Sequence, residues 1–353
     1  MTSAPGESRE SDLAYQAAIL QRVSRTFALT IPRLPDGLRD VVANVYLLCR
    51  IADAIEDDPA LTLEQKRAFS ARFVDLVGGR GDASDFAGEL GALLSAETPD
   101  AEHDLIANAP RVIRVTRGCR DPQRQAIERC IRIMSNGMVE FQEYGTTAGL
   151  RDVPHLERYC YCVAGVVGET ATALYCDYCV ELEERREELL ALAVSFGQGL
   201  QVTNILKDVW DDQRRGACWL PRDLFAPPGR EWEGPSAGQT DARFVDGLVK
   251  LLTIARSRLR DGLQFILLIP AREAGIRRHL LWTLGLAVLT WRRLCTTPSF
   301  RKGENIRLSR MKVGAGMLLI SAVARSDRAL KILFRAATRG LPAGARPDSQ
   351  DAA

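Results

Sequence analysis

Histidine is scarce in this chain of 353 residues, which holds three, and aromatic residues make up only 7% of it. So few histidines argue against a His-rich metal site or a catalytic triad built on histidine. The net charge is +2, so no overall basic surface points to nucleic acid, and we expect no nucleic-acid partner. Nine cysteines are odd in number and too few for a disulfide framework. With no signal peptide recognised, we expect reduced thiols and a cytoplasmic location.

Strand signals are equally rare, because no segment alternates strictly and no Asn-Gly or Asp-Gly hairpin joins β-branched runs. Apolar residues instead recur every three or four positions, as at Val41, Val45, Leu48, Ile51 and Ile55. No change in composition divides the chain. We therefore predict an all-α fold with one domain at residues 13–338, a flexible N-terminus at 1–12 and a flexible C-terminal tail at 339–353.

Charge and hydropathy along the chain leave the question of membrane contact open. We take residues 280–291 and 313–324 as the longest uncharged apolar runs. Both are shorter than the roughly 20 residues that a membrane span needs. Residues 272–312 hold ten Lys or Arg and two Glu, a local net charge of +8. This stretch is interpreted as a solvated helix face, a contact with an anionic membrane surface, or a site for a phosphate-rich ligand.

Two acidic motifs interrupt the apolar pattern. Asp53 and Asp57 form one D-x-x-x-D motif, and Asp208 and Asp212 form another. On a helix, residues i and i+4 project from one face about 5–6 Å apart, and like charges there are mildly destabilising. Mg²⁺ prefers carboxylate, phosphate and water oxygens. Two facing acidic helices therefore predict a site for Mg²⁺ and a diphosphate, with two solvated acidic helices as the alternative.

A third stretch, YCYCVAGVVGE at residues 159–169, is made of small and apolar residues. Gly165 and Gly168 inside a helix cost about 1 kcal/mol each relative to Ala, which implies close packing or a substrate channel. Tyr159 would place a phenol at the edge of such a cavity, where it can carry a proton or face a cation. Plain helix packing is the alternative for this stretch taken alone.

Together these stretches resemble the squalene/phytoene synthase family of head-to-head isoprenyl diphosphate synthases. The likeness runs from SRTF at 24–27 through DAIED at 53–57, MSNGMVEF at 134–141 and the 159–168 stretch to 208–212 and WLP at 219–221. SFRKG at 299–303 is similar to a basic segment of squalene synthases that phytoene synthases generally lack. We expect no C-terminal membrane helix of the eukaryotic kind, so the likeness is to a bacterial type of squalene synthase, a farnesyl-diphosphate farnesyltransferase. The resemblance implies an isoprenoid-synthase helical bundle with a central active-site cavity.

The resemblance also implies an activity. Two farnesyl diphosphates would condense head to head with several Mg²⁺ ions to give presqualene diphosphate, and NADPH-dependent rearrangement would give squalene for sterol or hopanoid biosynthesis. Dehydrosqualene or phytoene synthesis, and a partial reaction ending at presqualene diphosphate or hydroxysqualene, are alternative outcomes. A non-catalytic binding protein on the same scaffold is a third class. Isoprenyl diphosphates are the expected small-molecule partners, downstream isoprenoid enzymes are candidate partners, and peripheral contact with the inner face of the membrane is expected.

The functional positions of the family carry over residue by residue. Its metal and diphosphate positions match Asp53, Glu56, Asp57, Asn204, Asp208 and Asp212. Its catalytic tyrosine matches Tyr159, which acts with the two aspartate pairs and Arg50. Its cavity positions match Ser24, Phe27, Tyr46, Val163, Gly168, Leu200, Gln201 and Asn204. Its NADPH positions match Arg25, Arg50, Lys207 and Arg301. Lys207 stands where the family often has Arg, and Ser299 where squalene synthases have Lys, so the cofactor contact is the less complete part of the match.

Overall fold

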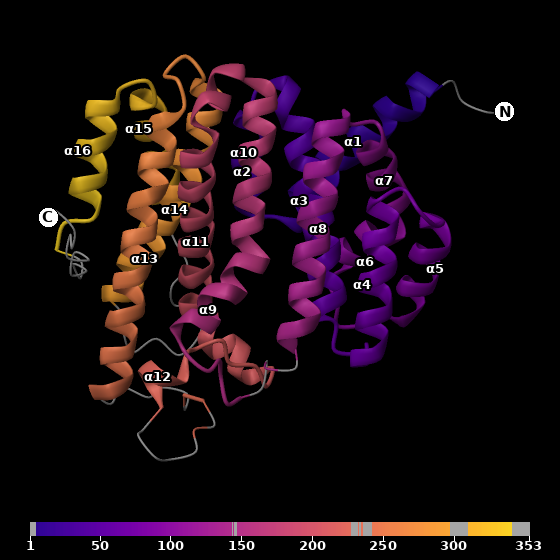
Figure 1. Ribbon diagram of the computed structural model, residues 1–353, viewed down its shortest axis with the longest axis horizontal. Helices are drawn as coiled ribbons and strands as arrows, with labels where there is room; N and C mark the ends of the chain where they lie inside the picture. The colour runs from indigo at the N-terminus through magenta and orange to yellow at the C-terminus, as the bar shows by residue number, and fades with distance from the viewer. Residues whose placement is uncertain are drawn as a thin grey trace, which may run out of the picture.

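The computed structural model describes residues 5–142, 144, 147–226, 232, 234–235, 242–296 and 310–340. Helices form its whole framework (Figure 1). In chain order they are α1 Pro5–Val23, α2 Phe27–Thr30, the 3₁₀ turn η1 Ile31–Arg33, α3 Asp36–Asp57, α4 Leu63–Val77, α5 Ala83–Leu93, α6 Asp100–Ala107, α7 Ala109–Arg117, α8 Asp121–Gln142, α9 Val153–Cys160, the π-helical turn η2 Tyr161–Gly165, α10 Val166–Tyr178, η3 Val180–Arg185, α11 Arg186–Arg214, α12 Arg222–Phe225, α13 Ala242–Leu268, α14 Ala274–Thr296, α15 Arg310–Val323 and α16 Asp327–Ala337.

Successive groups of helices occupy successive parts of the molecule (Figure 1). Figure 1 shows α1 and α3–α8 towards one end, α13–α16 at the other, and α9–α11 between them. Within the described ranges there is no strand, and the only β pairing recorded is an isolated bridge between Leu150 and Pro221. The prediction of an all-α fold is confirmed.

Helix α3 shows how the sequence pattern positions the site. Its apolar residues at three- and four-residue spacing, among them Leu38, Leu48, Ile51 and Ile55, are all fully buried. Burying each such side chain stabilises the fold by about 1.5–3 kcal/mol. Asp53 and Asp57 of α3 project from a different part of the helix surface and line a cavity. The apolar stripe therefore fixes the rotation of the helix that aims the carboxylates.

Helix α11 corrects the expectation about long apolar runs. The helical stretch Val180–Arg214 is long and apolar enough to cross a membrane by length and composition, and half of its most apolar window is buried in the fold. Polar but uncharged residues such as Gln198, Gln201 and Asn204 interrupt this stretch, so it does not stand out in the sequence as an apolar run. The helix packs against α10 and α13 and carries one aspartate pair, so here it is a core helix.

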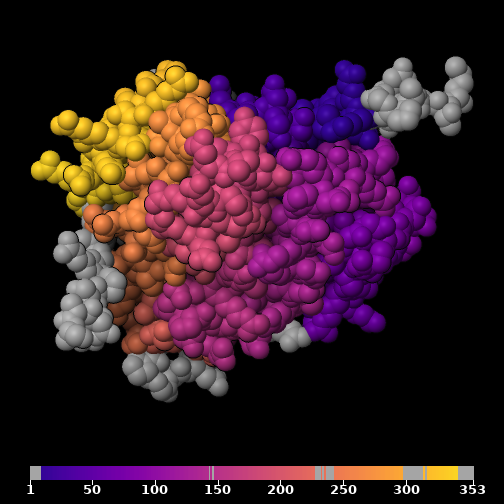
Figure 2. Space-filling view, turned by 45° about the horizontal axis from the view of Figure 1, so that its top comes forward, coloured from indigo at the N-terminus to yellow at the C-terminus, as the bar shows by residue number. Residues whose placement is uncertain are grey.

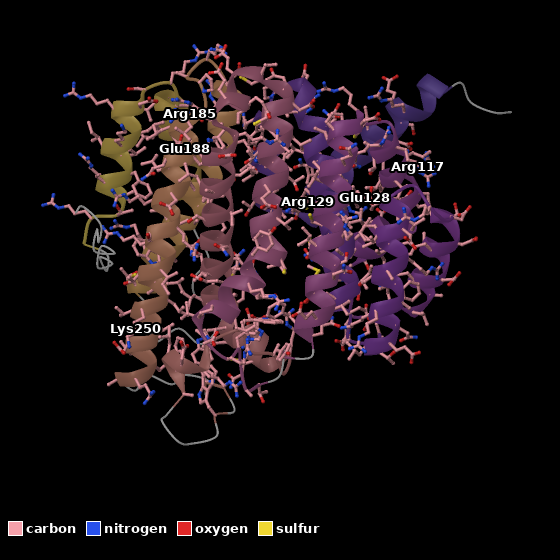
Figure 3. The ribbon with its side chains drawn as sticks, in the orientation of Figure 1. Arg117, Glu128, Arg129, Arg185, Glu188 and Lys250 are labelled. Carbon is pink, nitrogen blue, oxygen red and sulfur yellow. The ribbon has the colours of Figure 1, made fainter. Side chains whose placement is uncertain are left out.

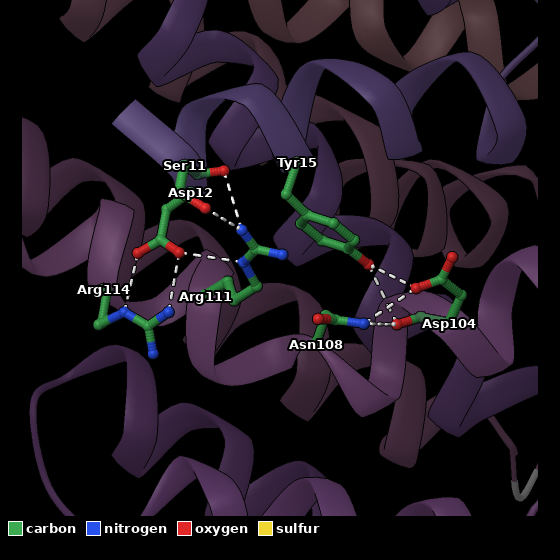
Figure 4. A network of polar contacts seen from close by, with 7 residues as sticks. All are labelled: Ser11, Asp12, Tyr15, Asp104, Asn108, Arg111 and Arg114. Atoms are coloured by element: carbon green, nitrogen blue, oxygen red, sulfur yellow. Dashed lines mark hydrogen bonds and ion pairs between the residues drawn. The ribbon is translucent and has the colours of Figure 1, made fainter. Parts of the chain in front are cut away.

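The N-terminal segment up to residue 12, expected from the sequence to be flexible, contains the first turns of α1. Helix α1 begins at Pro5, and Asp12 is 3% exposed. Arg114 holds both Asp12 carboxylate oxygens with two 2.8 Å hydrogen bonds, and Arg111 donates another at 3.0 Å (Figure 4). Burial raises the pKa of Asp12, but the two arginines lower it overall. A polar segment thus becomes ordered through partners about a hundred residues away. At the other end, α16 stops at Ala337, and residues 341–353 lie outside the described ranges.

Candidate active site

Five carboxylates from two helices line the mouth of one cavity. Asp53, Glu56 and Asp57 occupy the last turns of α3, and Asp208 and Asp212 lie near the end of α11. Each aspartate pair is helical, as its spacing predicted. Burial raises the pKa of Asp212 to about 6 despite the ion pair with Arg215, and both Asp208 and Asp57 add to the rise. Because Asp57 acts from α3, the two acidic helices face each other.

Burial also raises the pKa of three other carboxylates of the site, Asp53, Glu56 and Asp208. Burial raises the pKa of Asp53 to about 7 against the opposing charge of Arg50, and Asp57 adds to the rise. Burial also raises the pKa of Asp208, which Lys207 opposes, and raises that of Glu56 well above its usual value. The cavity mouth therefore holds more negative charge than its cations compensate, which favours binding of additional cations.

The cations of the site pair with carboxylates close in sequence. Arg50 Nη1 lies 3.4 Å from Asp53 Oδ2, and Lys207 Nζ lies 3.1 Å from Asp208 Oδ2. Arg50 also forms an ion pair with Glu102 of α6, whose side chain is 12% exposed. Sequence reasoning missed Glu102 and Arg215. Arg215 follows Asp212 at the helical spacing of three, so the sequence could have predicted this ion pair. No feature of the sequence around Glu102 predicts its contact with Arg50.

Tyr159 lines the same cavity and is close enough to the carboxylates to feel their charge. Its ring stacks on Trp219, with centroids 4.3 Å apart and planes 3° from parallel. Burial, together with the carboxylates Glu56, Asp57 and Asp212, raises the pKa of Tyr159 well above its usual value, so the phenol keeps its proton. The bridge at Leu150, which accepts from the Arg222 amide and donates to Leu220 O, holds the chain that carries Trp219.

The glycine-rich stretch after Tyr159 is more irregular than the expected continuous helix. Residues 161–165 form a π-helical turn between α9 and α10. A Cβ on Gly168 would lie 2.5 Å from Ala193 O, so α10 and α11 touch through their backbones there. This is the close packing that the glycines implied. Val163 and Gly168 also line the cavity.

The cavity itself has a volume of about 820 Å³. Away from the carboxylates its wall is mainly apolar. Every predicted site residue within the described ranges lines it: Ser24, Arg25, Phe27, Tyr46, Arg50, Asp53, Glu56, Asp57, Tyr159, Val163, Gly168, Leu200, Gln201, Asn204, Lys207, Asp208 and Asp212. Arg301 and its neighbours at 299–303 lie outside those ranges.

Much of the apolar wall was not identified from the sequence. It comes from α3, α8, α10, α11, α13 and α14 and includes Val42, Val45, Met134, Met138, Val167, Ala171, Leu174, Tyr175, Phe196, Phe265, His279, Leu280 and Thr283. His279, which the sequence placed in a basic context, is 6% exposed, and burial lowers its pKa to about 4. The helical spacing of these residues predicts that they are buried. It does not show whether a buried side chain lines a cavity or packs in the solid core.

The carboxylates fit Mg²⁺ only as part of a larger ligand set. Among the described residues, no group of three or more His, Cys, Asp or Glu side chains is gathered closely enough to hold a metal ion alone. Mg²⁺ characteristically takes one or two carboxylates and completes its shell with phosphate and water oxygens. Separated carboxylate pairs on facing helices supply that partial set, so the donors fit Mg²⁺ bound together with a diphosphate.

Comparison with known proteins places the chain in a family. The squalene/phytoene synthase family model matches residues 20–312. The chain belongs to the squalene/phytoene synthase family, whose members carry out head-to-head condensation of isoprenyl diphosphates and typically use Mg²⁺.

Individual relatives agree with this assignment. The chain is 31% identical over 219 residues to a squalene synthase of Gibberella zeae, covering 61% of this chain and 44% of that one. It is 29% identical over 313 residues to a squalene synthase of Botryococcus braunii, covering 85% and 63%. The chain thus spans about half to two-thirds of the length of these relatives. A lycopaoctaene synthase of Botryococcus braunii is 30% identical over 77% of this chain and 55% of its own.

Solved structures share the fold. The TcSQS protein, solved with a ligand, superposes with a TM-score of 0.69 at 22% identity and covers 97% of this chain and 94% of its own. A dehydrosqualene synthase gives a TM-score of 0.67 at 20% identity, covering 92% and 100%. These two structural similarities confirm the isoprenoid-synthase bundle. They concern the fold alone.

Proposed function

We propose that this chain condenses two farnesyl diphosphates to presqualene diphosphate with Mg²⁺, and then uses NADPH to convert that intermediate to squalene. The observation that carries the first half is the pair of facing acidic helices at the mouth of a large, mainly apolar cavity. Ligand pockets commonly range from about 300 to 1,000 Å³, so about 820 Å³ is large. A charged mouth and an apolar interior match a diphosphate attached to a long hydrocarbon chain.

Charge at the cavity mouth supports the need for a divalent cation. Five carboxylates and four cationic side chains line the cavity: Asp53, Glu56, Asp57, Asp208 and Asp212, against Arg25, Arg50, Lys207 and Arg215. A diphosphate adds further negative charge to a site that is already short of cations. Mg²⁺, when bound, would neutralise the leaving diphosphate as its bond to carbon breaks. Asp53, Asp57, Asp208 and Asp212 are the residues proposed to hold it, with Glu56 and Asn204 beside them.

The remaining site residues are proposed to guide the carbocation. Tyr159 keeps its proton and presents an aromatic ring, which can stabilise a cation through its π face. The apolar wall, with Val163, Leu200 and Phe27 among its members, keeps water away from the reacting carbons. Arg50 and Arg25 would bind diphosphate oxygens by charge-assisted hydrogen bonds.

The NADPH half has narrower support. Of its proposed residues, Arg50 and Lys207 already pair with carboxylates, and Arg301 lies outside the described ranges. Its support is the basic character of these side chains and the names of the squalene synthase relatives. Identifying the product formed with NADPH tests the reductive step directly.

The test is product identification. The purified protein is incubated with farnesyl diphosphate and Mg²⁺, with and without NADPH, and the products are identified by mass spectrometry. We expect presqualene diphosphate without NADPH and squalene with it. Dehydrosqualene, or hydroxysqualene regardless of NADPH, would refute the reductive step. Phytoene from geranylgeranyl diphosphate would refute the substrate, and no turnover of either would favour a binding protein.

Substitutions at the acidic pairs connect that activity to the site. Asp53→Asn and Asp208→Asn should each lower kcat by about 100-fold or more, because each removes a carboxylate proposed to hold Mg²⁺. Asp36→Asn is the matched control, since Asp36 lies on the same helix as Asp53 but its side chain is 90% exposed, far from the cavity lining. Near wild-type turnover of either cavity variant in saturating Mg²⁺ would contradict the metal assignment.

A further inference from the structure

The last two helices expose large apolar side chains. Leu318 and Leu319 on α15 are 76% and 51% exposed, and Ile332 on α16 is 56% exposed. Most large apolar residues of the described chain are buried, so two adjacent exposed leucines are unusual. Helices α15 and α16 pack against each other at the end of the molecule opposite the N-terminal helices (Figures 1 and 2). Their exposed residues therefore belong to one end of the fold.

The same pair of helices is strongly basic. Residues 310–340 contain seven Lys or Arg and a single acidic residue, Asp327. That aspartate is already occupied, because its Oδ1 lies 2.7 Å from Nη1 of Arg277, a residue only 2% exposed. Nothing acidic in this segment is left to balance its exposed cations.

The charge of α16 is concentrated on its outer face. Arg328, Lys331 and Arg335 are exposed and spaced at three and four, so they share one side of the helix. The opposite side turns Leu330 and Phe334 towards the core. None of the three cations has an ion pair recorded within the described part of the chain. Helix α16 thus presents a basic face next to the exposed leucines of α15.

This surface differs from the basic stretch at 272–312 that the sequence suggested. Arg277 is buried, Arg272 pairs with Glu181, and Arg292 donates to Ala337 O at 2.7 Å. Several of the charges counted there are therefore used within the fold. Arg328, Lys331 and Arg335 of α16 are exposed and have no such partner recorded among the described residues.

An apolar groove of about 160 Å³ runs beneath these helices. Its wall includes Leu281 and Leu284 of α14, together with Met317 and Ile320 of α15 and Phe334 of α16. The other side of α14 contributes to the large cavity. One helix therefore separates the cavity from the groove and from the surface above it.

We propose that α15 and α16 form a docking surface for an anionic lipid bilayer, with Leu318 and Leu319 entering the interface and the basic face of α16 contacting the headgroups. Exposed leucines beside unbalanced cations are the combination that binds amphipathic helices to anionic membranes. A protein partner would have to supply both an apolar pocket and a matching acidic patch, whereas an anionic bilayer supplies both chemistries at once. The inference does not depend on the product of the reaction.

The test uses the full chain and co-sedimentation with vesicles of phosphatidylcholine, with and without phosphatidylglycerol, at low and high NaCl. We expect binding only to the anionic vesicles and release at high salt. Each Lys or Arg near such a surface contributes about fivefold in affinity. Arg328→Gln/Lys331→Gln/Arg335→Gln should therefore weaken binding at least about tenfold. Leu318→Ser/Leu319→Ser should weaken binding while leaving its salt dependence in place.

A charge-matched control distinguishes binding through this surface from general electrostatic attraction between a basic protein and an anionic membrane. Arg117→Gln/Arg185→Gln/Lys250→Gln removes the same charge from other elements (Figure 3) and should leave binding within about twofold. Thermal melting checks that each variant is folded. Equal losses in the control and the α16 variant, or no binding to any vesicle, would overturn the proposal. So would concentration-dependent self-association that the leucine variant abolishes, because the surface would then join copies of the chain.

Discussion

Substituting Gly168 with alanine tests how closely α10 and α11 must approach. The added Cβ would lie 2.5 Å from Ala193 O and 2.9 Å from Ala193 C, both backbone atoms of α11. Neither atom can move without moving its helix, so α10 and α11 must separate. Overpacking of this kind costs about 1–3 kcal/mol, while replacing a helical glycine by alanine returns up to about 1 kcal/mol. We expect a net loss of about 1–2 kcal/mol.

The consequence for activity follows from the positions of the two helices in the cavity wall. Helix α10 contributes Val167 and Ala171, and α11 contributes Leu200 and Asp208. Separating the helices moves the aspartate pair of α11 relative to that of α3. We therefore expect Gly168→Ala to lower kcat as well as the melting temperature, the latter by a few degrees.

The matched control is Gly88→Ala. Gly88 lies inside α5, is exposed, and has no atom within 4 Å of an added Cβ. Its substitution should stabilise the protein by up to about 1 kcal/mol and leave turnover unchanged. Differential scanning calorimetry and steady-state kinetics measure both effects. If Gly168→Ala stabilises the fold as much as Gly88→Ala and keeps full activity, the close approach of α10 and α11 has been misjudged.

Three further predictions concern the charged mouth. Glu102→Gln should raise KM about tenfold and Glu102→Asp should restore it, because the carboxylate of Glu102 holds Arg50; steady-state kinetics decides, and an unchanged KM would exclude a positioning role. The pKa of Asp53, raised to about 7, makes the ion-free protein lose stability as pH rises from about 4 to 7. Asp53→Asn should therefore raise the melting temperature at pH 8 but not at pH 4. The gain should be smaller than the free energy of about 4 kcal/mol that this pKa shift represents, because the variant also loses the ion pair with Arg50; no gain at pH 8 would contradict this. Mg²⁺ with inorganic diphosphate should raise the melting temperature more than the sum of either alone, because the carboxylates supply an incomplete shell; additive shifts would refute joint binding.

The aspartate pairs could be found from the sequence because their signal is local. Helical periodicity fixes the relation between Asp53 and Asp57, and their apolar neighbours show that the surrounding face is buried. Glu102 could not be found in this way. It reaches Arg50 from another helix, and its own segment reads as an ordinary exposed acidic turn. Only the packing of α6 against α3 brings the two charges together.

The apolar end of the cavity shows a second limit of sequence reasoning. Leu280 and Leu281 are adjacent, equally apolar and both buried, yet Leu280 lines the large cavity and Leu281 lines the separate groove. Hydrophobic spacing predicts that both side chains are buried. It does not predict which part of the structure each side chain faces. Hydrophobic spacing is equally silent on the stacking of Trp219 on Tyr159, because the two rings come from segments that are distant in sequence.

The recorded ion pairs of the two aspartate motifs are local to each motif. Arg50 pairs with Asp53 at a spacing of three on α3, and Lys207 and Arg215 pair with Asp208 and Asp212 at spacings of one and three. Within the described ranges, no recorded ion pair joins α3 to α11. The ion pairs are therefore local to each helix, while Arg215 also attracts Asp57 and Glu56 of α3 and offsets part of the repulsion between the two acidic faces. Cations that bind between the two faces together with a ligand would be attracted by the carboxylates of both helices. The same repulsion penalises the ion-free protein most at high pH, so the joint effect of Mg²⁺ and diphosphate on stability should grow as the pH rises.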